Sequence, residues 1–252
     1  MMPKVDLNSD MGEGFGPWPM GDDAALLRVV TSANVACGFH AGDPDVMSRT
    51  MRLAVENGVG IGAHPGFPDL QGFGRRKMEV PHPTLANMVR YQVGAAAAMA
   101  ASVGGRLRHL KLHGALANMA AEDAAMARVC YEAALGVQPD LVVMVLAATE
   151  QERAAKSLGC AVAHEIFADR AYEDDATLVD RRKPGAVIHD PARAAARMVE
   201  MVQEGAIIAE SGRRIPTRID TICLHGDTPE AVEIARAVRA ALEGAGVDVA
   251  GL

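Results

Sequence analysis

Aromatic residues are scarce in this sequence of 252 residues, which contains one tryptophan, three tyrosines and five phenylalanines. Half of all residues are nevertheless hydrophobic, so alanine, valine, leucine and the 14 methionines must fill the core. Positive charge is also in deficit, since 25 lysines and arginines face 32 aspartates and glutamates. The net charge of −7 argues against nucleic acid or an anionic membrane surface as a partner.

Long apolar runs are missing as well. The longest, such as residues 141–148, fall far short of the roughly 18 residues that a membrane-spanning helix needs. The first residues lack the apolar segment of a signal peptide. The four cysteines, Cys37, Cys130, Cys160 and Cys223, show neither metal-binding nor redox spacing, and Cys37 and Cys223 are expected in the core. We therefore expect a reduced chain in the cytoplasm, without a membrane partner.

Three functional motifs are absent. The sequence has no GxxxxGK[ST] phosphate loop, no GxGxxG after a strand and no GxSxG nucleophile elbow. The run Gly12-Glu-Gly-Phe-Gly16 resembles a glycine loop only superficially, because no helix begins directly after it to accept a phosphate. These absences argue against a nucleotide-binding loop of either kind and against a serine hydrolase.

One pattern does occur four times: a strand-like apolar run that ends in a histidine beside glycine or proline. The four histidines are His40, His64, His113 and His225. A single histidine at such a position is more often structural than catalytic, but four at equivalent positions favour a function. In a barrel of alternating strands and helices, the carboxyl ends of the strands gather on the face that carries the chemistry. We therefore expect these four imidazoles to converge.

Seven strand-like runs, each followed by a helical pattern, predict a parallel sheet. The expected strands are residues 4–10, 32–39, 59–63, 109–113, 141–147, 161–167 and 221–224. The expected helices are residues 22–30, 45–57, 84–103, 122–135, 150–158, 192–205 and 228–242. Polar tips on six strands favour a closed (β/α) barrel over an open doubly wound sheet, which gathers its ligand at one switch point. Since no break in composition marks a boundary, we predict one TIM-barrel-like α/β domain over residues 1–252.

Charged and amide side chains lie near the predicted strand tips. Carboxylates can orient the imidazoles, hold a metal or act as a base themselves, and an imidazole with a pKa of about 6.5 suits proton transfer near neutral pH. Arginines can bind an anionic substrate bidentately, and for Arg181 and Arg182 a solvated basic cluster is an equally good explanation. The candidate substrate-binding residues are Asn8, Glu13, Asn34, Arg75, Arg76, Glu165, Arg170 and Asp227.

A metal is the competing use of these side chains. Three histidines, or two histidines and a carboxylate, with one open position would activate a water molecule. No local ligand spacing is present, because His109 and His113 lie four residues apart on a strand and not on a helix. The presence of a metal stays open at this point, and we expect no tightly held stoichiometric ion.

Seven blocks of the sequence resemble, in their order, those of the LamB/YcsF family. The blocks are residues 6–13, 32–44, 60–65, 72–76, 111–116, 167–170 and 223–227. The resemblance implies a seven-stranded barrel similar to that of polysaccharide deacetylases, in the glycoside hydrolase/deacetylase superfamily. It also implies a hydrolase that acts with two partner subunits, B and C, to convert 5-oxoproline to glutamate with ATP as co-substrate. Leu112 and Ala117 depart from the proline and tyrosine that are usual in the family, which bears on the shape of the pocket.

The residues agree with this implied activity. Opening a lactam needs an activated water and a group that stabilises the developing oxyanion. The expected catalytic residues are Asp10, His40, His64, Lys111, His113, Asp169 and His225, without a fixed assignment of base and acid. The absent phosphate loop fits ATP that is bound largely by the partners. Two alternatives stay open: a stand-alone metal-dependent deacetylase or amidohydrolase, and a non-catalytic scaffold protein within the complex.

Overall fold

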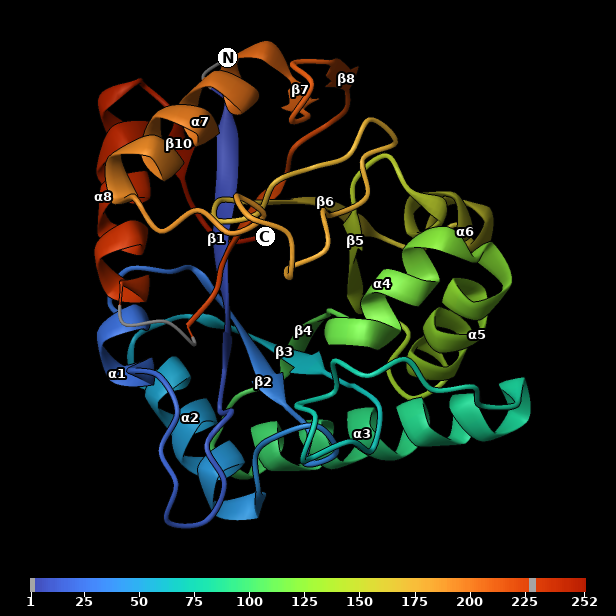
Figure 1. The fold of residues 1–252 in the computed structure, drawn as a ribbon. Coiled ribbons are helices and arrows are strands. Elements are labelled where there is room, and N and C mark those ends of the chain that lie inside the picture. Colours follow the sequence, from blue (N-terminus) through green and yellow to red (C-terminus); the bar gives the residue numbers. More distant parts are fainter. Residues whose placement is uncertain (1–2, 227–229) are drawn as a thin grey trace.

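Seven parallel strands close into a barrel in the computed structural model, which describes residues 3–226 and 230–252 (Figure 1). The strands are β1 (Lys4–Met11), β2 (Ser32–Ala36), β3 (Gly60–His64), β4 (Leu107–Leu110), β5 (Val142–Leu146), β6 (Val162–Phe167) and β9 (Thr221–Leu224). Each strand pairs with the next one named, and β9 pairs with β1 to close the ring. The predicted seven-stranded (β/α) barrel is therefore confirmed.

Helices surround the barrel and connect its strands (Figure 1). They are α1 (Asp23–Leu26), α2 (Pro44–Glu56), α3 (His82–Ser102), α4 (Gly114–Glu122), α5 (Ala124–Leu135), α6 (Glu150–Leu158), α7 (Pro191–Glu204) and α8 (Ala231–Gly244). The starts of α2 and α7 follow one rule, an aspartate cap followed by proline at the first helical position. Asp43, for example, accepts hydrogen bonds from the backbone N–H groups of Asp45 and Val46.

The structure differs from the sequence prediction at helix α4, at an added hairpin and a short added strand, and at the end of β2. Helix α4 begins directly after His113, whereas the predicted helix begins at residue 122. The alanine-rich sequence of α4 contains only two polar residues, Asn118 and Glu122, too few to mark a helix. An antiparallel hairpin, β7 (Ala206–Ile208) with β8 (Arg214–Pro216), lies between α7 and β9. The short strand β10 (Asp248–Val249) pairs with the beginning of β1. Strand β2 ends at Ala36, earlier than predicted, and the backbone of Gly38 then takes a positive φ of 89°.

The barrel lumen is polar, and this explains the alternation in β1. Asp6, Asn8 and Asp10 contact side chains from other barrel strands. Leu7 and Met11, which alternate with them, belong to the hydrophobic core. Both sets are buried, so β1 is an interior strand and its polar residues face a polar interior and not the solvent.

The four cysteines are free thiols. Burial raises the pKa of Cys37 and Cys130 to about 12, so both stay protonated. Cys223 is buried as expected, although its thiol contacts a lysine in the lumen. Of the helices in the described ranges, none combines the length and the apolar character needed to cross a bilayer.

Candidate functional site

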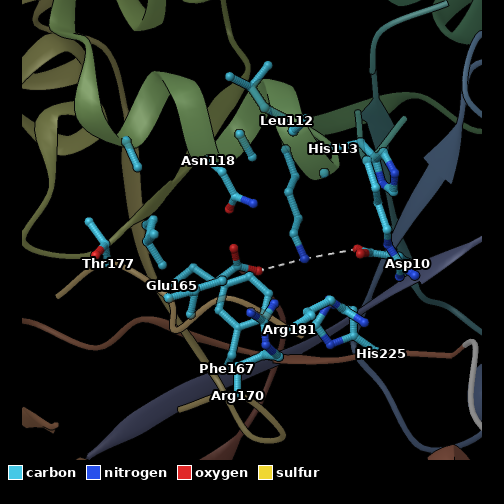
Figure 2. Close-up of a pocket in the computed structure, with 18 of the residues that line it drawn as sticks. Asp10, Leu112, His113, Asn118, Glu165, Phe167, Arg170, Thr177, Arg181 and His225 are labelled. Atoms are coloured by element: carbon cyan, nitrogen blue, oxygen red, sulfur yellow. Dashed lines mark hydrogen bonds and ion pairs between the residues drawn. The ribbon is translucent and has the colours of Figure 1, made fainter. Parts of the chain in front are cut away.

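An ammonium group at the carboxyl end of the barrel is held between two carboxylates (Figure 2). Lys111 Nζ lies 2.9 Å from Asp10 Oδ1 and 2.8 Å from Glu165 Oε1. It also lies 3.1 Å from Asn8 Oδ1 and 2.9 Å from Cys223 Sγ. Three strands, β1, β6 and β9, thus supply the partners of one lysine, whose side chain is 5% exposed.

The two carboxylates around Lys111 differ in their affinity for protons. Burial opposes the charge of Lys111, but Asp10 together with the other acidic neighbours outweighs this effect, and the pKa of the lysine lies well above its usual value. Burial also opposes ionisation of Asp10, yet His64 and Lys111 hold its pKa well below the usual range. For Glu165 burial prevails over Lys111, and the pKa is raised. Such a separation marks Asp10 as the ionised partner and Glu165 as the carboxyl group that more readily binds a proton.

Asn34 positions the Asp10 carboxylate from the neighbouring strand. Its Nδ2 donates to Asp10 Oδ1 at 2.8 Å and to Asn8 Oδ1 at 2.7 Å. Its Oδ1 lies 2.8 Å from Nε2 of His109, which therefore donates. Burial lowers the pKa of His109 to about 3, so this ring is neutral. A Cβ at Gly62 would overlap the His109 ring, and only glycine fits there. The two amides that were predicted to bind substrate thus form hydrogen bonds within the lumen, Asn34 with Asp10 and Asn8 with Lys111.

Three of the four predicted histidines converge, together with Glu13, in what we call the imidazole cluster (Glu13, His40, His64 and His113). His113 Nδ1 lies 3.0 Å from His64 Nε2, and the rings of His40 and His113 stack with centroids 3.6 Å apart. Glu13 Oε1 lies 3.7 Å from His40 Nε2 and 3.9 Å from His113 Nδ1. His64 Nε2 is also 3.4 Å from Asp10 Oδ2, which joins the cluster to Lys111. All four members are buried, and they can hold a metal ion.

His225, the fourth histidine, pairs with Asp169. Its Nδ1 lies 2.8 Å from each oxygen of the Asp169 carboxylate, so Nδ1 carries the hydrogen. Burial opposes ionisation of Asp169, but His225 and then Arg181 outweigh it and lower the pKa of that carboxyl. Nε2 of His225 accepts a hydrogen bond from Arg181 at 3.1 Å, and the ring stacks on Phe167. The result is a carboxylate–imidazole pair with a fixed tautomer.

Two arginines of the predicted set have different surroundings. Arg170 is 4% exposed, its Nη2 donates to the carbonyl oxygen of Val179, and burial followed by Arg181 lowers its pKa to about 10. Its Nε has no hydrogen-bond partner within the described parts of the chain. Arg76 instead forms an ion pair with Asp69, and its side chain is 65% exposed. The structure does not bring Arg76 to the site.

A cavity of about 670 Å³ joins these groups. Figure 2 shows side chains from the two ends of the chain around it, with Asp10 and His225 close to each other and Glu165 across from them. Leu112 and Ala117, the two departures from the family pattern, both line it. Predicted site residues that line it are Asp10, Glu13, His64, Arg75, Lys111, His113, Glu165, Arg170 and His225. Asp227 lies outside the described residues.

Sequence reasoning missed one contributor to this site and one contact of a residue that it had named. The carbonyl oxygen of Phe73 lies 2.8 Å from His113 Nε2 and orients that ring from a long loop. Arg181 reaches His225 from the segment between β6 and α7, although the basic run that contains it was visible in the sequence. Neither contact leaves a local pattern, because both depend on the path of a loop across the barrel mouth.

Comparisons with known proteins identify similar chains. The LamB/YcsF family profile matches residues 5–252. A protein of Ruegeria pomeroyi that is named as one subunit of 5-oxoprolinase is 68% identical, with 98% of each chain covered. The crystal structure of a lactam utilization protein from Thermus thermophilus superposes with a TM-score of 0.92 at 44% identity and covers 99% of this chain and 100% of its own.

A more distant likeness concerns the fold alone. A family 4 carbohydrate esterase from Streptomyces lividans has a TM-score of 0.51 and 11% identity, and the match covers 98% of this chain and 91% of the esterase. The barrel architecture predicted by analogy with carbohydrate-active deacetylases is therefore confirmed. At this identity the likeness carries no information about substrate.

Proposed function

The chain belongs to the LamB/YcsF family, and from this membership we propose that it hydrolyses the cyclic amide of 5-oxoproline as part of an ATP-dependent enzyme. The relative from Ruegeria pomeroyi, named as one subunit of 5-oxoprolinase, supports this substrate, as does the lactam utilization protein from Thermus thermophilus. The structural observation that carries the proposal is the buried Lys111 ammonium beside Asp10 and Glu165. Such a group can stabilise the negative charge that develops on an attacked amide oxygen.

Ring opening also needs proton transfer to and from water and nitrogen. We propose that His225, held by Asp169, takes a proton from the attacking water at Nε2. Glu165, with its raised pKa, is suited to deliver a proton to the departing lactam nitrogen. Lys111 is then the electrostatic stabiliser and Asp10 the group that keeps it charged.

The substrate carboxylate requires a positive partner. Arg170 is the best candidate because it lines the cavity, is buried and has an Nε–H without a partner in the described part of the chain. A guanidinium–carboxylate contact at this position would both bind and orient the small ring. The cavity of about 670 Å³ lies within the range of roughly 300–1,000 Å³ that is usual for ligand sites. It leaves room beside a single five-membered ring.

ATP and further subunits complete the proposal. The names of the relatives describe them as one subunit of an enzyme, and the sequence lacks both common nucleotide-binding loops. We propose that ATP is a co-substrate bound largely by partner subunits B and C, in the cytoplasm. The free thiols of this chain are compatible with that reducing compartment.

Reconstitution tests the proposed function. ATP hydrolysis that depends on 5-oxoproline, and release of glutamate, are measured with the purified chain alone, with the two partners alone and with the complete complex. Turnover is expected only from the complete complex. Efficient turnover of both reactants by the single chain would overturn the division of labour, and no turnover by any combination would overturn the substrate.

The imidazole cluster favours one alternative, a metal-dependent amidohydrolase that acts alone. Release of acetate from acetylated sugars or peptides by the chain without ATP would support that alternative. A scaffold role would instead leave the activity of the complex unchanged when His225 is replaced by glutamine. The proposed function requires that this variant lose activity.

A further inference from the structure

Hydrogen bonds to carbonyl oxygens fix the tautomers of two rings in the imidazole cluster. His64 Nδ1 lies 2.8 Å from the backbone oxygen of Lys111, and His113 Nε2 lies 2.8 Å from the backbone oxygen of Phe73. A carbonyl oxygen only accepts hydrogen bonds, so each of these ring nitrogens must carry the hydrogen. In the neutral rings, His64 Nε2 and His113 Nδ1 therefore carry lone pairs.

These two lone-pair nitrogens face each other at 3.0 Å. Lone pairs at this separation repel, and a cation between them removes the repulsion. The cation is either a shared proton or a metal ion. A proton would place a buried imidazolium beside two further imidazoles, although Asp10 Oδ2, 3.4 Å from His64 Nε2, would partly offset its charge. Neutral imidazole is also the form that binds metals.

His40 separates the two explanations. Its side chain is fully buried, and within the described residues neither of its ring nitrogens has a hydrogen-bond partner. A proton shared by His64 and His113 does not explain why the nitrogens of His40 are buried without a partner. Its Nε2 faces Glu13 at 3.7 Å, which is too far for a hydrogen bond. The ring is nevertheless held closely, since a Cβ at Gly66 would lie 2.7 Å from His40 Nδ1.

We propose that the imidazole cluster binds one divalent transition-metal ion through His40, His64, His113 and the carboxylate of Glu13. The four ligand atoms lie within 4.8 Å of one another, and such a set of nitrogen donors with one carboxylate suits Zn²⁺ and not Mg²⁺ or Ca²⁺. The carbonyl oxygens of Lys111 and Phe73 then act as outer partners that orient two of the ligands. Glu13, His64 and His113 line the cavity, so the ion lies in its wall. This departs from the expectation of no tightly held ion, which rested on the absence of local ligand spacing.

The proposal is tested by measuring metal binding to the full chain, without 5-oxoproline, ATP or partner subunits. Protein freed of metal with a chelator is titrated with Zn²⁺ by calorimetry and with Co²⁺ by visible absorption, whose intensity reports the coordination number. We expect one ion per chain and Co²⁺ bands of a nitrogen-rich site. His40→Gln and His113→Gln should each weaken binding by roughly 100-fold or more, since loss of an outer partner alone costs about 10- to 100-fold. His164→Gln is the control, because His164 is also buried beside two carboxylates, Asp220 and Glu152, but lies outside the cluster.

Two results would overturn the metal site: no saturable binding of either ion, or equal binding by the cluster variants and the control. If a cluster variant fails to fold, histidine ¹⁵N shifts of the wild-type chain decide the matter. One equivalent of Zn²⁺ should shift the signals of three histidines together, whereas a shared proton gives a pair that titrates with pH and ignores Zn²⁺. Because these readouts need no substrate, the metal site and the proposed function can fail separately.

Discussion

Arg181 donates a hydrogen bond to Nε2 of His225 over 3.1 Å, while Asp169 occupies the other nitrogen of the same ring. The ring is therefore a neutral imidazole with hydrogen only on Nδ1, oriented from both ends. Any proton that it takes from water must arrive at Nε2, after Arg181 has moved. A substrate carboxylate that attracts this guanidinium would expose the base at the moment of binding.

His225→Gln separates catalysis from packing at this position. Glutamine can still donate a hydrogen bond to Asp169 but cannot take up a proton, so the rate of the reconstituted enzyme should fall roughly 10²–10⁴-fold. The melting temperature should stay close to that of the wild-type chain, as it should for His189→Gln, whose side chain is 65% exposed. A large loss of stability with nearly normal turnover would remove His225 from the catalytic residues.

Lys111→Met should destabilise the fold because it leaves Asp10 and Glu165 buried without their cation. The expected loss is about 3–5 kcal/mol in the free energy of unfolding. Adding Asp10→Asn should recover part of it, since the carboxylate that stays ionised is then removed. Lys156→Met, at an exposed ion pair with Glu152, should change stability by less than about 1 kcal/mol. Denaturant unfolding of the four proteins measures these values, and a fully stable Lys111→Met chain would contradict the buried ion pair.

Asp169→Asn should lower stability at neutral pH and much less in acid. The pKa of Asp169 is depressed in the folded chain below its ordinary value of 3.8, because His225 and the arginines outweigh burial. A depressed carboxyl pKa stabilises the fold above the unfolded value, and this contribution disappears as the pH falls through the folded value. The difference between the unfolding free energies of the two chains should therefore narrow as the pH is lowered from about 7 to about 3. A difference that is independent of pH would show that the charge of Asp169 is not responsible.

Arg170→Lys tests recognition of the substrate carboxylate. Lysine keeps the positive charge but loses the planar fork, so KM for 5-oxoproline should rise roughly 10-fold or more. With 2-pyrrolidinone, the same lactam without a carboxylate, wild type and variant should react alike. Arg76→Lys is the matched control, because Arg76 is exposed and paired with Asp69. An equal effect of Arg170→Lys on both lactams would assign Arg170 a structural role.

The meeting of the histidines was predictable because it depends on topology alone. In a parallel barrel every strand ends on the same face, so His40, His64 and His113 had to lie near one another once the strands were recognised. Their division into a cluster and a separate His225 was not predictable. It depends on side-chain directions beyond the strand ends, where Gly38 and Gly114 take positive φ angles and period-two alternation no longer applies.

The loop residues were harder to place for the same reason. Arg75 and Arg76 are adjacent in the sequence, yet Arg75 lines the cavity and lies over the Phe73 ring, whereas Arg76 pairs with Asp69 at the surface. Both residues are arginines, so neither charge nor residue type distinguishes them. Their different positions follow from the turn that begins at Asp69. The Asp69 carboxylate accepts hydrogen bonds from the backbone of Gly72 and from the side chain of Arg76.

The closure of the barrel by β9 against β1 also sets the order of events during synthesis. Thr221 donates a hydrogen bond to Asp6 across 215 residues of sequence, and Asp10 and His225 meet at the same cavity. While β9 is still inside the ribosome, the edge of β1 that later pairs with β9 is open, and His225 is missing from the cavity. Long-range pairings of this kind form slowly and leave exposed strand edges open to aggregation while they form. The chain should thus depend on chaperones up to the emergence of its last strands, and ribosome-stalled lengths that end before β9 should be sensitive to protease.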